Sequence, residues 1–220
     1  MARAVASTLA LGVFLALALF VPAGRLSWPM AWAVLLFYMA FSAAGFLLLP
    51  EALIEERSRL PQDTQPADLL IAGLAFVFLY PATLVVCGLD ARWHWSPPIP
   101  AAIQGAALAV FALGYALSLW AARSNPFFSA VVRIQRERGH HVIASGPYAF
   151  VRHPGYAGPI LGHLCLPIAL GSLRGLVPAA LGIAFLVLRT AYEERTLARD
   201  LPGYREYALR VRWRLIPGLW

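Results

Sequence analysis

The stretch LLIAGLAFVFLYPATLVVCGL, residues 69–89, decides the fold class of this 220-residue chain. It runs for 21 residues without a charged side chain, between Asp68 and Asp90. A helix needs about 20 apolar residues to cross the hydrocarbon core of a bilayer, because each residue adds roughly 1.5 Å along the axis. The stretch therefore predicts a membrane-spanning helix.

Comparable runs lie on both sides of this stretch. Four more charge-free runs are long enough to span a bilayer, namely residues 4–24, 26–50, 93–122 and 154–173. A sixth run, residues 175–188, is shorter, but its helical composition continues without Gly or Pro until Pro202, so we interpret it as a full helix. We predict an all-α, polytopic integral membrane protein with about six membrane helices, of which the last two form a C-terminal hairpin.

The first run has a competing interpretation. Arg3 precedes the apolar residues and Val21 to Ala23 loosely resembles a cleavage site, as in a signal peptide. We favour a retained span.

The composition agrees with a membrane protein and argues against nucleic acid and metal ions as partners. The chain is 60% hydrophobic, 13% charged and carries a net charge of +7, which is too apolar for an ordinary soluble domain. All 18 basic residues are Arg, and 13 of them follow residue 122 on segments interleaved with apolar runs. This pattern favours anionic groups of membrane lipids as partners and argues against nucleic acid. The His and Cys residues form no pair at metal-ligand spacing, so we expect no metal site.

The distribution of Arg predicts the orientation in the membrane. With six spans, 15 Arg fall on one side, and only Arg25, Arg92 and Arg174 fall on the other. The positive-inside rule then places both termini and the large polar segments, with any active site that they carry, in the cytoplasm. For the polar segment 51–68 we favour a solvated loop over a short surface helix through Leu53, Ile54 and Leu60.

Chemistry-bearing residues are densest between the fourth and fifth spans. Residues 123–158 read RSNPFFSAVVRIQRERGHHVIASGPYAFVRHPGYAG. The pairs Gly146-Pro147 and Pro154-Gly155 predict turns, since Pro fixes φ and Gly permits positive φ. Such a loop can fold over a ligand. The competing interpretation is a surface connector whose Arg anchor lipid phosphates.

A second group lies at the end of the last span. Arg189 and Glu193 are four residues apart and share a helix face, and Glu194 follows directly. Two adjacent acids near a helix C-terminus repel each other and oppose the helix dipole, so they need a cationic partner. Either a neighbouring Arg or a positively charged ligand would serve.

Two further patterns predict packing rather than chemistry. Gly158 and Gly162 form a G-x-x-x-G step that lets another helix approach closely. In the tail, Tyr204, Tyr207 and the alternating run 210–215 favour an interfacial anchor, with a lid over the site as the alternative.

The ordered combination GPYAFVRHPGYAG, an apolar hairpin, RTAYEER and a closing RLIPGLW resembles the isoprenylcysteine carboxyl methyltransferase family and the wider group of membrane phospholipid methyltransferases. The resemblance covers roughly Asn125 to Trp220. It implies an enzyme that binds S-adenosyl-L-methionine at the cytoplasmic face and methylates a lipophilic acceptor from the bilayer, with a carboxylate as the expected acceptor. Charge, Gly and Pro become dense in the C-terminal half, so we divide the chain into four spans, residues 1–122, and a region, residues 123–220, that by the resemblance binds the cofactor and carries catalysis.

The resemblance carries the family's site residues onto ten positions. The catalytic pair near the acceptor would be Arg152 and Arg189. The cofactor-binding residues would be Gln135, His140, Gly146, Tyr148, His153, Tyr156, Glu193 and Glu194. An ionised carboxylate needs no general base, whereas an amine or thiol would need one, such as His140, His141 or His153.

Two other functions remain open from the sequence. A sterol-type membrane reductase that uses NADPH has a similar closing tail, and a non-catalytic membrane cofactor-binding protein would show the same spans. The methyltransferase hypothesis makes a geometric prediction: the Arg152–Tyr156 turn must meet Glu193 and Glu194 beside one cavity.

Overall fold

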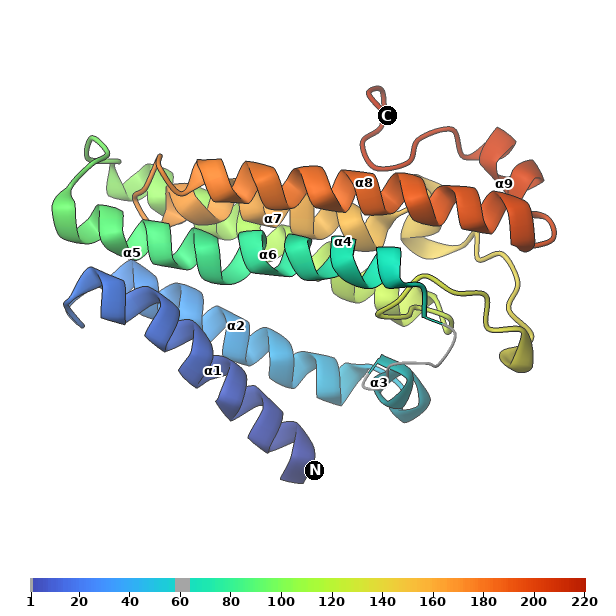
Figure 1. The fold of residues 1–220 in the computed structure, drawn as a ribbon, viewed down its shortest axis with the longest axis horizontal. Helices are drawn as coiled ribbons and strands as arrows, with labels where there is room; N and C mark the ends of the chain where they lie inside the picture. The colour runs from blue at the N-terminus through green and yellow to red at the C-terminus, as the bar shows by residue number, and fades with distance from the viewer. Residues whose placement is uncertain (1, 58–63) are drawn as a thin grey trace.

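The computed structural model describes residues 2–57 and 64–220, and these residues form helices and loops without a strand (Figure 1). The helices in chain order are α1 Ala2–Ala23, α2 Pro29–Leu48, α3 Glu51–Arg57, α4 Pro66–Val77, α5 Thr83–Trp93, α6 Ala101–Ser124, α7 Pro154–Ala169, α8 Leu176–Asp200 and α9 Tyr204–Arg210. A π-helical segment, Phe78–Ala82, joins α4 to α5 around Pro81. Proline removes a backbone donor, which accounts for the change of helix type at this point.

The predicted all-α, polytopic membrane fold is confirmed. Five helices among the described residues are long and apolar enough to cross a membrane: α1, α2, the continuous helix Pro66–Trp93, α6 and α8. The remaining predicted span, residues 154–173, forms α7, which has 16 residues and is roughly 24 Å long, shorter than a hydrocarbon core of about 30 Å. Gly171, at φ +77°, lies in the turn that follows it. The run 175–188 is part of a full-length helix, as expected.

The hairpin helix α7 packs tightly on α6 through glycines. A Cβ on Gly158 would lie 2.2 Å from the carbonyl oxygen of Gly114, and a Cβ on Gly114 would lie 2.9 Å from the nitrogen of Gly162. Because no side chain fits between the backbones, the two helices approach at their glycine faces. The G-x-x-x-G step therefore serves helix packing, as predicted.

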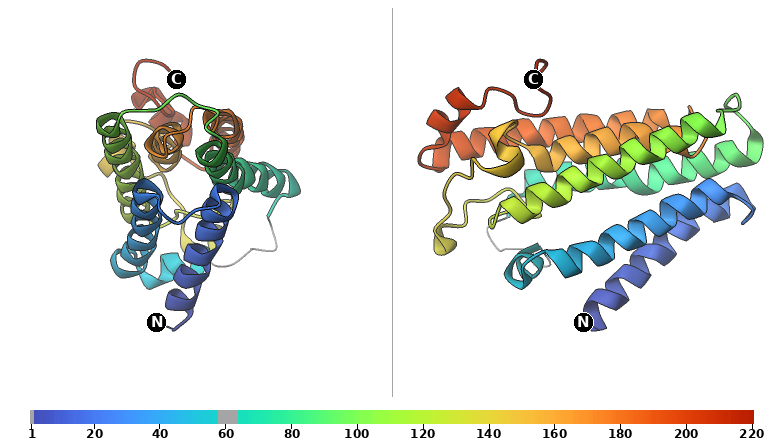
Figure 2. Two further views of the ribbon diagram at one scale, coloured as in Figure 1. Left: turned by 90° about the vertical axis from the view of Figure 1, so that its left-hand side faces the viewer. Right: turned by 180° about the vertical axis from the view of Figure 1, so that it is seen from behind.

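The N-terminal hairpin packs on the rest of the bundle at one end and tilts away from it at the other (Figure 2). Leu15 and Leu19 of α1 are buried with Val34 of α2 and Phe111 of α6 in one hydrophobic cluster. The first run of the sequence is thus an integral part of the core.

The two ends of the bundle differ in character. At one end the buried carboxylate of Asp90 accepts hydrogen bonds from the Ser96 and Ser172 hydroxyls, both at 2.5 Å, and fastens two loops. The other end gathers α3, the long loop after α6 and α9 (Figure 1). Here the expectation for residues 51–57 was wrong, because they form α3 with Leu53 buried; Leu60 lies outside the described residues.

Candidate active site

The turn that starts at Gly146 brings Tyr148 inward. Gly146 has φ +58°, and a Cβ there would lie 2.6 Å from the Ser124 hydroxyl, so glycine suits both the backbone and the close approach to α6. The buried Tyr148 hydroxyl accepts a hydrogen bond from the Asn125 side chain at 3.2 Å. Burial raises the pKa of Tyr148, which remains a neutral phenol.

The predicted convergence of the two polar groups is confirmed. Arg152 Nη2 lies 2.8 Å from Glu194 Oε1, and His153 Nε2 donates to Glu194 Oε2 at 2.7 Å. The Tyr204 hydroxyl donates to the same carboxylate oxygen at 3.1 Å. The cationic partner of Glu194 is therefore a side chain of the protein.

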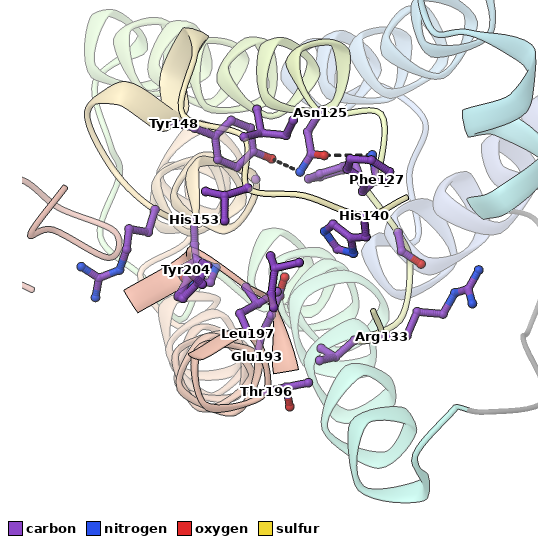
Figure 3. Close-up of a pocket in the computed structure, with 18 of the residues that line it drawn as sticks. Asn125, Phe127, Arg133, His140, Tyr148, His153, Glu193, Thr196, Leu197 and Tyr204 are labelled. Atoms are coloured by element: carbon purple, nitrogen blue, oxygen red, sulfur yellow. Dashed lines mark hydrogen bonds between the residues drawn. The ribbon is translucent and has the colours of Figure 1, made fainter. Parts of the chain in front are cut away.

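Glu193 has a different environment. Its carboxylate accepts a 2.6 Å hydrogen bond from the Tyr156 hydroxyl and borders the central cleft (Figure 3). Within the described chain, no Arg or His nitrogen lies within salt-bridge distance of it. Of the two adjacent acids, one is neutralised by the protein and the other faces the cleft.

The cleft itself lies between the loop after α6, the N-terminal end of α7, the C-terminal half of α8 and α9. Six of the ten predicted positions line it: His140, Tyr148, Arg152, His153, Tyr156 and Glu193. The other four, Gln135, Gly146, Glu194 and Arg189, lie behind its walls.

Three of these four act through neighbouring groups. The fully buried Gln135 donates from Nε2 to the carbonyl of Phe127, which holds the loop closed. Gly146 packs on α6, and Glu194 anchors Arg152 and His153.

Arg189 is occupied by a carboxylate from the front half of the chain. Its Nε and Nη2 donate to the two oxygens of Asp68 at 2.8 and 3.1 Å, and Nη2 also donates to the carbonyl of Ala130 at 2.6 Å. Asp68 is fully buried. This bidentate pair joins α4 to α8 and to the cleft loop, and sequence reasoning missed it because 121 residues separate its members.

Arg152 is engaged in the same way. In addition to Glu194 it binds the carbonyl oxygens of Val211 and Arg212 through Nη1, at 2.7 and 2.9 Å. Most of the N–H donors of Arg152 are used inside the protein. Neither of the two arginines predicted to be catalytic therefore has its guanidinium free to bind an acceptor carboxylate.

The imidazole of His140 is neutral and, in this form, holds the loop in place. Its Nδ1 accepts a hydrogen bond from the backbone nitrogen of Gln135, and its ring stacks on Phe127 with centroids 4.4 Å apart. Burial, together with nearby His141 and Arg133, lowers the pKa of His140 to about 4. Nδ1 is thus an acceptor at neutral pH.

The C-terminal tail after α8 contributes to the cleft, a position that we did not favour from its sequence. We favoured an interfacial anchor, but Tyr204 and Tyr207 are buried and line the cleft. The Tyr207 hydroxyl donates to the carbonyl of Tyr148 at 2.7 Å, and the backbone nitrogens of Arg152 and His153 donate to carbonyls of the tail. Thr196 and Leu197 were also missed, although their spacing of three and four from Glu193 places them on one helix face.

Comparison with known proteins tests the resemblance. Residues 107–199 match the model of the isoprenylcysteine carboxyl methyltransferase family. The match supports the resemblance stated from the sequence motifs, and we call residues 107–199 the family region. The family region begins inside α6 and ends near the C-terminus of α8, so the fourth span contributes to it, whereas we expected it to start at Asn125.

Two curated proteins resemble the chain in parts. It is 26% identical to the Lamin-B receptor of Drosophila melanogaster over 163 residues, which cover 66% of this chain and 22% of that protein. It is 37% identical to the cobalt-zinc-cadmium resistance protein CzcN of Cupriavidus metallidurans over 81 residues, which cover 36% of this chain and 37% of that protein. The chain thus spans less than two-fifths of either relative. Within residues 2–57 and 64–220, no three His, Cys, Asp or Glu are grouped as for a metal ion.

Proposed function

We propose that the chain is an integral-membrane methyltransferase that uses S-adenosyl-L-methionine and acts on a lipophilic acceptor with a carboxylate head. The observation that carries this proposal is Glu193, a carboxylate that faces the cleft without a cationic partner among the described side chains. A carboxylate in partly desolvated surroundings favours a cationic ligand, because its charge is otherwise uncompensated.

The residues that line the cleft fit this cofactor. Glu193 suits its ammonium group, and Tyr148 and Tyr156, which also line the cleft, are of a residue type that can stabilise a sulfonium by cation–π contact. His140, stacked on Phe127, offers a flat surface for a nucleobase. The cleft is narrow, about 100 Å³, so a ligand of nucleoside size enters only if the loop over residues 125–145 shifts outward.

The protein's own contribution is placement. When bound, the cofactor supplies an electrophilic methyl group, whose transfer leaves its bonding electron pair on sulfur. The cleft residues hold the donor end, exclude water and fix the direction of approach, and positioning of this kind supplies a large share of the rate. A carboxylate acceptor is ionised at neutral pH and needs no base, whereas an amine or thiol would require His153 or another cleft histidine.

We further infer that the two halves of the chain have different roles and that the protein has a defined orientation in the membrane. Residues 123–220 form the cofactor-binding and catalytic region, and residues 1–122 supply the spans that admit the acceptor. The Arg bias, 15 to 3, supports a cytoplasmic position for the cleft and both termini.

Thermal unfolding of the detergent-purified protein tests the proposal. S-adenosylhomocysteine at 100 times its dissociation constant is expected to stabilise the folded state by about 2.7 kcal/mol. Glu193→Gln should abolish this response, because the neutral amide no longer pairs with the ammonium group. Glu206→Gln removes an exposed acid from α9 and should leave the response intact.

Two other ligand responses would contradict the assignment. Stabilisation by reduced nicotinamide adenine dinucleotide phosphate alone would favour a reductase. A wild-type melting curve unchanged by either ligand would favour a non-catalytic membrane protein.

A further inference from the structure

A second, larger cavity adjoins the cleft. It has a volume of about 420 Å³ and lies between α2, α3, the π-helical segment, α6 and α7. Most of its lining is apolar, including Phe41, Phe46, Leu49 and Leu119. Its size falls in the range of small-molecule sites, roughly 300–1,000 Å³, and its walls suit a hydrocarbon chain.

Arg57 is the one charged side chain that lines this cavity in the described part of the protein. Its guanidinium carbon lies 4.9 Å from the centre of the Phe128 ring. No carboxylate of the described residues lies within salt-bridge distance of it, in contrast to Arg133, Arg152 and Arg189. Arg57 is exposed and lines the cavity, so its guanidinium is accessible to a ligand.

The position of Arg57 is fixed by its neighbours on α3. Leu53 is buried, and Glu56 pairs with Arg133 of the cleft loop at 3.1 Å. The Ser129 hydroxyl donates to the same Glu56 carboxylate. These contacts hold α3 against the cleft loop, so the Arg57 guanidinium is presented at a defined place.

The cavity and the cleft share a wall made of Phe128 and Gly155. A Cβ on Gly155 would lie 2.4 Å from the Phe128 ring, so only glycine allows this ring to separate the two spaces. Gly155 lies in the first turn of α7, whose positive dipole end also favours an anion there. A head group beside Arg57 is therefore adjacent to the cofactor cleft.

We propose that Arg57 binds the anionic head group of the lipid acceptor while its chain occupies the apolar cavity. This inference rests on the proposed function and assigns the acceptor contact to α3, outside the family region, because Arg152 and Arg189 are already occupied by carboxylates of the protein. A guanidinium without a carboxylate partner among the described residues can attract a carboxylate ligand, and it repels a protonated amine.

Binding of radiolabelled palmitic acid to the detergent-purified protein tests this assignment, with palmitamide as the uncharged probe of equal length. Wild type should bind the acid at least tenfold more tightly than the amide. Arg57→Gln should remove this preference, and Arg57→Lys should restore part of it. The matched control is Arg195→Gln, which removes an exposed arginine from α8 and should keep the wild-type preference.

The outcomes separate this inference from the proposed function. Unchanged stabilisation of Arg57→Gln by S-adenosylhomocysteine shows that the variant is folded and that only acceptor binding has changed. A preference for the acid that survives Arg57→Gln, or a wild type without such a preference, overturns the role of Arg57. Failure of wild type to respond to S-adenosylhomocysteine overturns the proposed function instead, whatever the lipid probes show.

Discussion

The residues around Glu194 illustrate how one carboxylate organises a turn, a helix and a tail. Arg152 reaches it with two nitrogens, His153 with one and Tyr204 with its hydroxyl. Burial and the adjacent Glu194 charge raise the pKa of Tyr204, which keeps this hydroxyl a donor. The group is a structural support for the cleft, and the carboxylate beside it, Glu193, accepts a hydrogen bond from Tyr156 and borders the cleft.

Arg152→Gln is expected to destabilise the protein by roughly 3–5 kcal/mol, because it leaves a buried carboxylate without its main counter-charge. The double variant Arg152→Gln with Glu194→Gln should lose less than the sum of the two single changes, since the unpaired charge is gone. Thermal unfolding of the four proteins in one detergent measures the coupling. Strictly additive losses would show that the pair does not stabilise the fold through its charges.

The loop between α6 and α7 is the element whose closure depends on protonation. With the pKa of His140 lowered to about 4, the folded state resists a proton that the unfolded chain accepts near pH 6.5. Stability is therefore fully present above pH 6.5 and declines as the pH falls from 6.5 toward 4, with no further change from this group below that. His140→Asn should flatten this part of the stability profile, measured by unfolding at successive pH values. His94→Asn, at an exposed position at the opposite end of the bundle, should not; an identical acid-side decline in both variants would contradict the assignment.

The elements differ in how far their sequences predict them. Spans such as residues 69–89 are predictable because a charge-free run of this length has one stable form in a bilayer. The α6–α7 contact is predictable from Gly158 and Gly162, and the cleft wall from the turn residues and the adjacent acids. The pair of Asp68 with Arg189 and the place of Arg57 were not predictable, because contacts between distant segments leave no local periodicity.

At the scale of the whole molecule, the more polar cleft is separated from an apolar cavity. The cleft is bordered by loop residues and the ends of α8 and α9, while the cavity lies among the helices of the bundle. A water-soluble donor and a lipid acceptor would thus arrive by different routes and meet at the Phe128 and Gly155 wall. The front spans, which lie mostly outside the family region, supply much of the lining of the cavity.

This arrangement serves a cytoplasmic cofactor only if the cleft end faces the cytoplasm. In a Cys165→Ser background, Ser145→Cys places an exposed thiol at the cleft end, and Pro98→Cys places one at the opposite end. A membrane-impermeant maleimide added outside intact cells should label the cysteine at 98 and leave that at 145 unlabelled until the cells are opened. We expect this labelling pattern because the Arg-rich loops lie at the cleft end, and moving such loops across the membrane is disfavoured. The remaining Cys87 is buried and serves as an internal blank. Labelling of position 145 in intact cells would reverse the orientation and place the cleft away from the cytoplasmic cofactor supply.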